Sequence, residues 1–187
     1  FLKFLFCFSM YISRRTLRNQ FDPRNSPPET YLLCELQWGE RGRPWIHWLR
    51  NKEYKSCHAE VYFLREIFEL RQPLYVNCYM TWYLSWSPCA DCCYEIRDFL
   101  TRHPNVYIDI HVARLYYTHV KSNRTGLRIL DRLPTVNHFV SISPDYYYCW
   151  ETFIQGDADD DSWPVNFQSE ITRNRSQLSY ILQVSTL

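Results

Sequence analysis

The chain has 187 residues, of which 46% are hydrophobic and 18% aromatic, and its formal net charge is +1. This length and composition suit one domain with a substantial core. The near-neutral charge argues against a duplex-DNA binder held mainly by phosphate contacts. The 8 cysteines lie in a long chain rich in core residues, so reduced thiols or metal ligands are expected rather than the disulfide framework of a small secreted domain.

The first residues differ from the rest of the chain. Residues 1–12 are mostly apolar, like the hydrophobic part of a signal peptide, but arginines follow them instead of a small-residue cleavage site. The run is also too short to span a bilayer. We therefore predict an N-terminal extension over residues 1–20, partly spurious or disordered, a single domain over residues 21–187, and no membrane association.

Strand-like and helix-like hydrophobic periods alternate along the rest of the chain. Strands are predicted at 31–38, 44–49, 74–84, 106–114 and 136–142. Helices are predicted at 58–70, 89–100, 123–133, 144–154 and 167–182, with an acidic linker over 156–162. This alternation predicts an α/β layered fold in which part of the sheet is parallel.

Two short motifs stand at the starts of two predicted helices. His58-Ala59-Glu60 opens one, and Pro88-Cys89-Ala90-Asp91-Cys92 opens the next. If the two helix starts lie side by side, His58, Cys89 and Cys92 can bind one Zn²⁺ ion and leave its fourth position open for water. Glu60, two residues after a ligand, can then move protons without binding the metal. His-x-Glu followed by Pro-Cys-x-x-Cys is the known signature of zinc-dependent nucleobase deaminases.

Other interpretations of the cysteines stay open at this point. A lone Cys-x-x-Cys is more often redox-active or part of a structural zinc site. A closed structural site needs a fourth ligand, for which Cys57 and Cys93 are the nearest candidates. Cys93 is also an alternative to Cys92 as the third ligand.

With Ser85-Trp86-Ser87-Pro88-Cys89, the chain resembles the AID/APOBEC family of polynucleotide cytidine deaminases. The resemblance covers residues 20–183 and includes Trp48-Leu49-Arg50-Asn51 and Ala113-Arg114-Leu115-Tyr116. Residues 32–39 and 99–106 look closest to the apolipoprotein-B messenger-editing branch. The chain stops at Leu187, without the long extension of mammalian members of that branch. The missing extension argues against editing through an RNA-binding auxiliary protein. Such a protein is nevertheless kept as a candidate partner.

The resemblance implies a cytidine-deaminase-like fold with a five-stranded mixed sheet flanked by about six helices. It also implies zinc-dependent hydrolytic deamination of cytosine to uracil in single-stranded DNA, RNA or both. The implied substrate-binding residues are Thr30, Asn51, Trp86, Ser87, Arg114, Tyr116 and Tyr117. Arg114 either positions a phosphate or braces the loop. Tyr117 either stacks on a base or lies at the rim, and His119 is a weaker candidate for reading the preceding nucleotide.

Two other functions compete with strand editing. A deaminase of free cytidine or deoxycytidylate would share the zinc site but lack strand contacts, and the extra aromatic loop residues argue against it. A zinc-stabilised nucleic-acid binding module would not need Glu60. A reducing cytoplasm and nucleus are the expected locations, because metal-binding thiolates persist there.

Overall fold

The computed structural model describes residues 11–51, 57–71, 76–155, 163 and 166–184. Its helices are α1 (Arg14–Phe21), α2 (Ala59–Tyr62), α3 (Ala90–Arg102), α4 (Lys121–Asp131), α5 (Ser143–Thr152) and α6 (Gln168–Gln183). A π-helical segment (Phe63–Phe68) and a 3-10 turn (Glu69–Arg71) continue α2. The strands are β1 (Tyr31–Trp38), β2 (Trp45–Arg50), β3 (Cys78–Leu84), β4 (Val106–Val112) and β5 (Val136–Val140). Within these described ranges, no helix combines the length and apolar character that crossing a bilayer requires.

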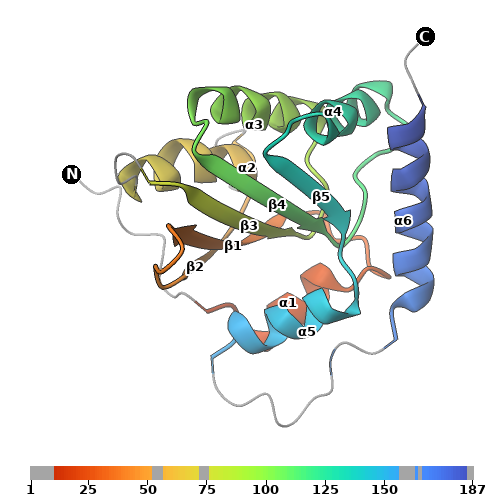
Figure 1. Ribbon diagram of the computed structural model, residues 1–187. Coiled ribbons are helices and arrows are strands. Elements are labelled where there is room, and N and C mark those ends of the chain that lie inside the picture. Colours follow the sequence, from red (N-terminus) through yellow and green to blue (C-terminus); the bar gives the residue numbers. More distant parts are fainter. Residues whose placement is uncertain (1–10, 52–56, 72–75, 156–162, 164–165, 185–187) are drawn as a thin grey trace.

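The strands form one five-stranded mixed sheet in the order β2-β1-β3-β4-β5, at the centre of the molecule in Figure 1. β1 pairs antiparallel with β2 and with β3, whereas β3–β4 and β4–β5 are parallel pairs. Parallel neighbours need a crossover connection, which α3 and α4 supply. The five predicted strands and the predicted mixed sheet are therefore confirmed, and α2 to α6 correspond to the five predicted helices.

The larger core lies between the sheet and helices α2, α3 and α4, which cover the upper face in Figure 1. Alternate residues of a strand face the same side of a sheet, and in β3 the alternate residues Cys78, Met80, Trp82 and Leu84 are all buried in this core. Trp82 packs edge-on against Phe63, with ring centroids 5.6 Å apart. This contact packs the helical segment that continues α2 against the sheet, and α2 begins directly after His58.

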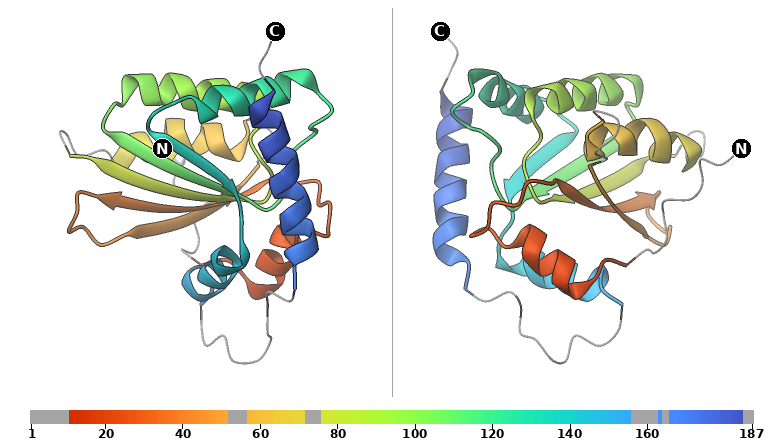
Figure 2. Two further views of the ribbon diagram at one scale, coloured as in Figure 1. Left: turned by 45° about the vertical axis from the view of Figure 1, so that its right-hand side comes forward. Right: turned by 180° about the vertical axis from the view of Figure 1, so that it is seen from behind.

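A second core lies on the opposite face, where α1 and α5 pack side by side beneath one end of the sheet (Figure 2). Leu17 and Phe21, four residues apart, lie on one side of α1 and are buried there. The sequence prediction had no helix here and assigned residues 1–20 to an extension. Residues 11–20 instead belong to the packed fold, while residues 1–10 and the predicted linker at 156–162 lie outside the described residues.

Candidate active site

His58, Cys89 and Cys92 lie together where α2 and α3 begin. His58 and Cys89 are the N-cap residues of these helices, and Cys92 lies in the first turn of α3. The His58 Nδ1 atom is 3.2 Å from Cys92 Sγ and 3.4 Å from Cys89 Sγ. The ligand atoms of all three residues lie within 4.8 Å of one another. The structure therefore brings together the three predicted donors in a cluster that can hold a metal ion.

The electrostatics of the cluster suit a cation. A hydrogen bond from Cys92 lowers the pKa of the Cys89 thiol to about 5. The hydrogen bond to Cys89 in turn raises the pKa of Cys92, so Cys89 is the cysteine of the pair that ionises more readily. The N-terminus of α3 adds partial positive charge that favours the thiolate form. One imidazole and two thiol groups form a donor set typical of zinc.

The structure decides between the cysteines that the sequence left open. Cys93 is buried and its thiol donates to the Pro88 carbonyl, with Sγ 3.7 Å from the oxygen. Neither Cys93 nor Cys57 belongs to the metal-binding cluster among the described residues. Cys92 is therefore the cysteine that completes the cluster with His58 and Cys89, and a tetrahedral ion held by these three residues would keep one position for water or substrate.

Glu60 lies in the first turn of α2 and is only 3% exposed. Its Oε2 atom makes no hydrogen bond in the structure. A buried carboxylate oxygen without a partner is costly and points to a partner outside the protein chain. Burial raises the pKa of Glu60 to about 7. A carboxyl group with that pKa can both accept and donate a proton at neutral pH.

Thr30 and Asn51, two predicted substrate contacts, lie next to each other. The Asn51 backbone N–H donates to the Thr30 carbonyl over 3.0 Å. The Asn51 side-chain oxygen accepts a hydrogen bond from the Ala59 N–H, with the two atoms 2.8 Å apart. Asn51 therefore caps α2 beside His58, and its NH₂ group has further donors to offer a ligand.

Trp86, Ser87 and Tyr116 join the segment before Cys89 to the loop after β4. The Ser87 Oγ accepts from the Tyr116 N–H over 2.8 Å. The Trp86 indole N–H donates to the Pro27 carbonyl over 3.0 Å, and its ring meets Tyr116 edge-on at 6.2 Å. These bonds place two aromatic rings close to the start of α3.

The Arg114 side chain is buried beneath this region and contacts the chain itself. Its guanidinium donates to the carbonyls of Gln20, Asp22 and Asn25, including a 2.6 Å bond to Asp22. It also lies over the Trp86 ring, 4.6 Å from the centroid. These contacts favour the bracing role over the phosphate-positioning role.

The loop between β4 and α4 presents Tyr117 and His119 at the surface. Tyr117 is 57% exposed, and its φ of 36° lies in the left-handed region that aromatic residues rarely adopt. Its ring packs edge-on against Tyr116 at 4.5 Å and against His119 at 5.4 Å. Arg124 of α4 holds the loop by donating to the Thr118 and His119 carbonyls over 2.8 and 2.9 Å. These contacts therefore hold the rings of Tyr117 and His119 in position beside Tyr116.

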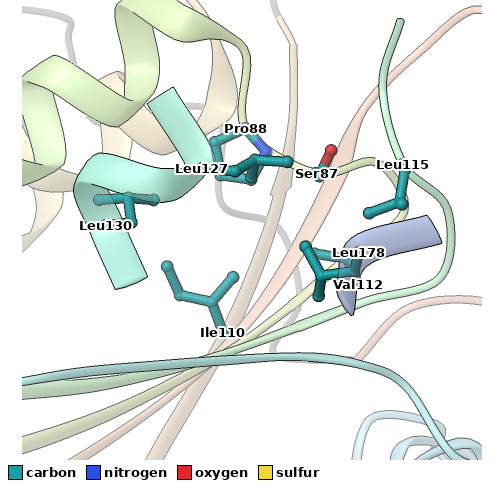
Figure 3. A pocket seen from close by; sticks show the side chains of 8 residues that line it. All are labelled: Ser87, Pro88, Ile110, Val112, Leu115, Leu127, Leu130 and Leu178. Atoms are coloured by element: carbon teal, nitrogen blue, oxygen red, sulfur yellow. The ribbon is translucent and has the colours of Figure 1, made fainter. Parts of the chain in front are cut away.

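A small apolar cavity adjoins the start of α3 (Figure 3). It is lined by Ser87, Pro88, Ile110, Val112, Leu115, Leu127, Leu130 and Leu178. Because almost all of these side chains are hydrocarbon, and the Ser87 hydroxyl is bonded to Tyr116, the cavity offers little to bind a polar base. It is part of the core behind the cluster.

The sequence prediction missed two residues of α4 that contact the metal-binding turn. The Asn123 side-chain oxygen accepts from the Ala90 N–H over 2.9 Å. A Cβ on Gly126 would lie 3.0 Å from Cys93 Sγ. Nothing in the local sequence pattern pointed to either residue, because both contacts join segments about thirty residues apart.

Comparison with known proteins gives concordant matches. A family model described as APOBEC4-like, within the AID/APOBEC deaminases, matches residues 20–156. The "C->U-editing enzyme APOBEC-1" of Pongo pygmaeus is 39% identical over 150 residues, which cover 77% of this chain and 60% of that protein. The mouse protein of the same name (Mus musculus) is 40% identical over 148 residues, covering 77% of this chain and 62% of that protein.

A relative whose name states a different activity also matches over most of its length. The "DNA dC->dU-editing enzyme APOBEC-3H" of Homo sapiens is 32% identical over 166 residues, covering 87% of this chain and 78% of that protein. The chain spans about 60% of the length of the APOBEC-1 proteins that it matches.

Proposed function

This chain belongs to the AID/APOBEC family of deaminases, and from that premise we propose that it is a zinc-dependent enzyme that converts cytosine to uracil in single-stranded nucleic acid. One observation carries the proposal. The three donors His58, Cys89 and Cys92 lie within 4.8 Å of one another, and the buried Glu60 carboxyl beside them has an oxygen without a partner.

The reaction needs a nucleophile and a group that moves protons. His58, Cys89 and Cys92 would hold Zn²⁺, which would supply the nucleophile by lowering the pKa of a water molecule. Glu60 supplies the second: its carboxylate takes a proton from the attacking water, delivers it to N3 of the base, and assists the proton transfer to the departing amino group. Cytosine and water are consumed, and uracil and ammonia are released. The near-neutral pKa of Glu60 suits both directions of transfer.

A polynucleotide substrate is supported by the aromatic groups near the cluster. Trp86 and Tyr116 flank the segment that leads to Cys89, and Tyr117 and His119 extend the aromatic surface outwards. Aromatic faces can stack unpaired bases at about 1–3 kcal/mol per base without a strongly basic surface. The relatives carry names for C->U editing and for DNA dC->dU editing, so both RNA and DNA are proposed substrates.

The test is an assay for uracil with three substrates: single-stranded DNA, RNA of the same sequence, and free cytidine. Zinc content is measured on the same samples. Deamination of either strand supports the proposal, whereas activity on free cytidine alone would support the nucleoside deaminase instead.

A pair of carboxyl variants tests the mechanism. Glu60→Gln should lower kcat by at least about 10²–10⁴-fold while the zinc content stays at the parent level, because the residue moves protons and does not bind the metal. Asp91→Asn is the matched control, since Asp91 is an exposed carboxyl in the first turn of α3 outside the donor set. Equal activity of Glu60→Gln and the parent would contradict the assignment.

Location and auxiliary partners are part of the same proposal. Metal-binding thiolates are expected to persist in the cytoplasm and nucleus, and none of the seven described cysteines forms a disulfide. Microscopy of the tagged full chain tests the location. Copurification with an RNA-binding protein would support an auxiliary partner.

A further inference from the structure

Both helices that carry the metal donors begin at a residue that does not cap its own helix. At the N-cap position, Ser, Thr, Asp or Asn usually accepts a hydrogen bond from an N–H of the first turn. His58 and Cys89 occupy these positions, and neither side chain makes such a bond. Their ligand atoms point toward each other instead, 3.4 Å apart. The first amides of both helices therefore need an acceptor from another part of the chain.

An asparagine from outside the helix supplies that acceptor in each case. The Asn51 side-chain oxygen accepts from the Ala59 N–H at the start of α2, over 2.8 Å. The Asn123 side-chain oxygen accepts from the Ala90 N–H at the start of α3, over 2.9 Å. The two ends of the metal-binding cluster are thus held by the same kind of bond.

Asn123 reaches the turn because α4 packs tightly against α3. Gly126 lies three residues after Asn123, on the same face of the helix. A Cβ at Gly126 would lie 3.0 Å from Cys93 Sγ and 3.2 Å from Ala90 Cα, so only glycine permits this approach without a shift. Asn123 is 7% exposed, and its NH₂ group also donates to the Tyr117 carbonyl over 3.4 Å. One side chain therefore contacts both the metal-binding turn and the aromatic loop.

We infer that Asn123 is a positioning residue of the metal centre, which caps the metal-binding turn of α3 in place of Cys89 and so leaves that thiolate free for the ion. The inference rests on the proposed function in one respect, namely that the cluster binds Zn²⁺. Side chains that orient metal ligands without touching the metal typically contribute about 10–100-fold to metal affinity. Loss of Asn123 should therefore weaken zinc binding by that factor.

The experiment compares two buried asparagines in the full chain. Asn123→Ala should raise the zinc dissociation constant about 10–100-fold, measured by competition with a chelator. The matched control is Asn174→Ala: Asn174 is 6% exposed in α6, and its side chain donates to the Ala113 carbonyl, which belongs to neither donor-carrying helix. The control should keep the parent's affinity. Hydrogen exchange at the Ala90 amide should accelerate in the first variant only.

A conservative variant separates capping from folding. Asn123→Asp keeps the acceptor oxygen, and its negative charge suits a helix N-terminus, so zinc affinity and Ala90 protection should stay close to those of the parent. This comparison also serves if Asn123→Ala does not fold.

Three results would overturn the inference. The first is that Asn123→Ala keeps the zinc affinity and the Ala90 exchange rate of the parent. The second is that Asn174→Ala loses as much zinc affinity as Asn123→Ala. The third is that Asn123→Asp fails to protect the Ala90 amide from exchange. A parent chain that binds no zinc would refute the proposed function as well, while the exchange data would still report on the cap.

Discussion

Replacement of Arg114 by Met tests whether this buried cation holds the segment between α1 and β1 in place. The variant keeps most of the side chain's length and apolar stem but removes every donor. The carbonyls of Gln20, Asp22 and Asn25 then lose their shared partner. The contact over the Trp86 ring at 4.6 Å is lost too.

The size of the effect follows from those contacts. A buried polar group left without its partner costs about 1–3 kcal/mol. Because Arg114 is only 4% exposed, water replaces it poorly, although two of the bonds are only partly buried. We expect a loss of about 3–5 kcal/mol from the free energy of unfolding, a large share of a typical total of about 5–15 kcal/mol. For a domain of this size that corresponds to a fall in Tm of about 6–20 °C.

The assay is equilibrium unfolding in urea with a thermal scan, on the zinc-loaded parent and variant. Arg24→Met is the matched control in the same segment. Arg24 pairs with Asp22 at 2.6 Å, and its side chain is 50% exposed whereas that of Asp22 is 9% exposed, so its loss should cost about 1–2 kcal/mol, less than the loss of Arg114. A loss below about 1 kcal/mol in Arg114→Met, or equal losses in the two variants, would refute the bracing role.

Three further predictions concern the loop, the helix contact and pH. Tyr116→Ala should lower kcat/KM on a single-stranded oligonucleotide about 5–100-fold, because base stacking is lost. The control Tyr79→Ala, which removes a ring that is 43% exposed elsewhere on the sheet, should leave kcat/KM unchanged. Equal effects of the two variants would contradict the role of the loop. Gly126→Ala should destabilise the domain by about 1–3 kcal/mol in urea unfolding, because the added methyl group presses into α3, and parent-like stability would show that the contact is loose. Burial lowers the pKa of His47 to about 4. The free energy of unfolding should therefore be highest above about pH 6.5 and should fall by on the order of 3 kcal/mol as the pH drops to about 4. If His47→Gln showed the same dependence of unfolding free energy on pH as the parent, this prediction would be contradicted.

Much of the site was predictable because its signal is local. His58-Ala59-Glu60 and Pro88 to Cys92 carry the ligand types, their spacing and their positions at helix starts within a few residues each. Hydrophobic periodicity likewise predicted the five strands, since alternate burial along a strand such as β3 is written in neighbouring residues. These features could be predicted because the residues that define each of them lie close together in the sequence.

The tertiary structure decided what depends on distant segments. Cys92 and Cys93 are equally plausible as ligands by type, and only the packing of α3 turns one toward His58 and the other toward the Pro88 carbonyl. Helix α1 was not predicted, because its several arginines obscure the apolar side that is buried in the core shared with α5.

The bracing contacts of Arg114 and the cap from Asn123 join residues that are 89–94 and 33 positions apart. Such hydrogen bonds leave no periodic trace in the sequence, because each depends on a single pair of groups that meet only when the sheet and helices have assembled. The sequence by itself therefore determined the candidate donors, except for the choice between Cys92 and Cys93, and the candidate proton-transfer residue. The folded chain determined which side chains hold them in position.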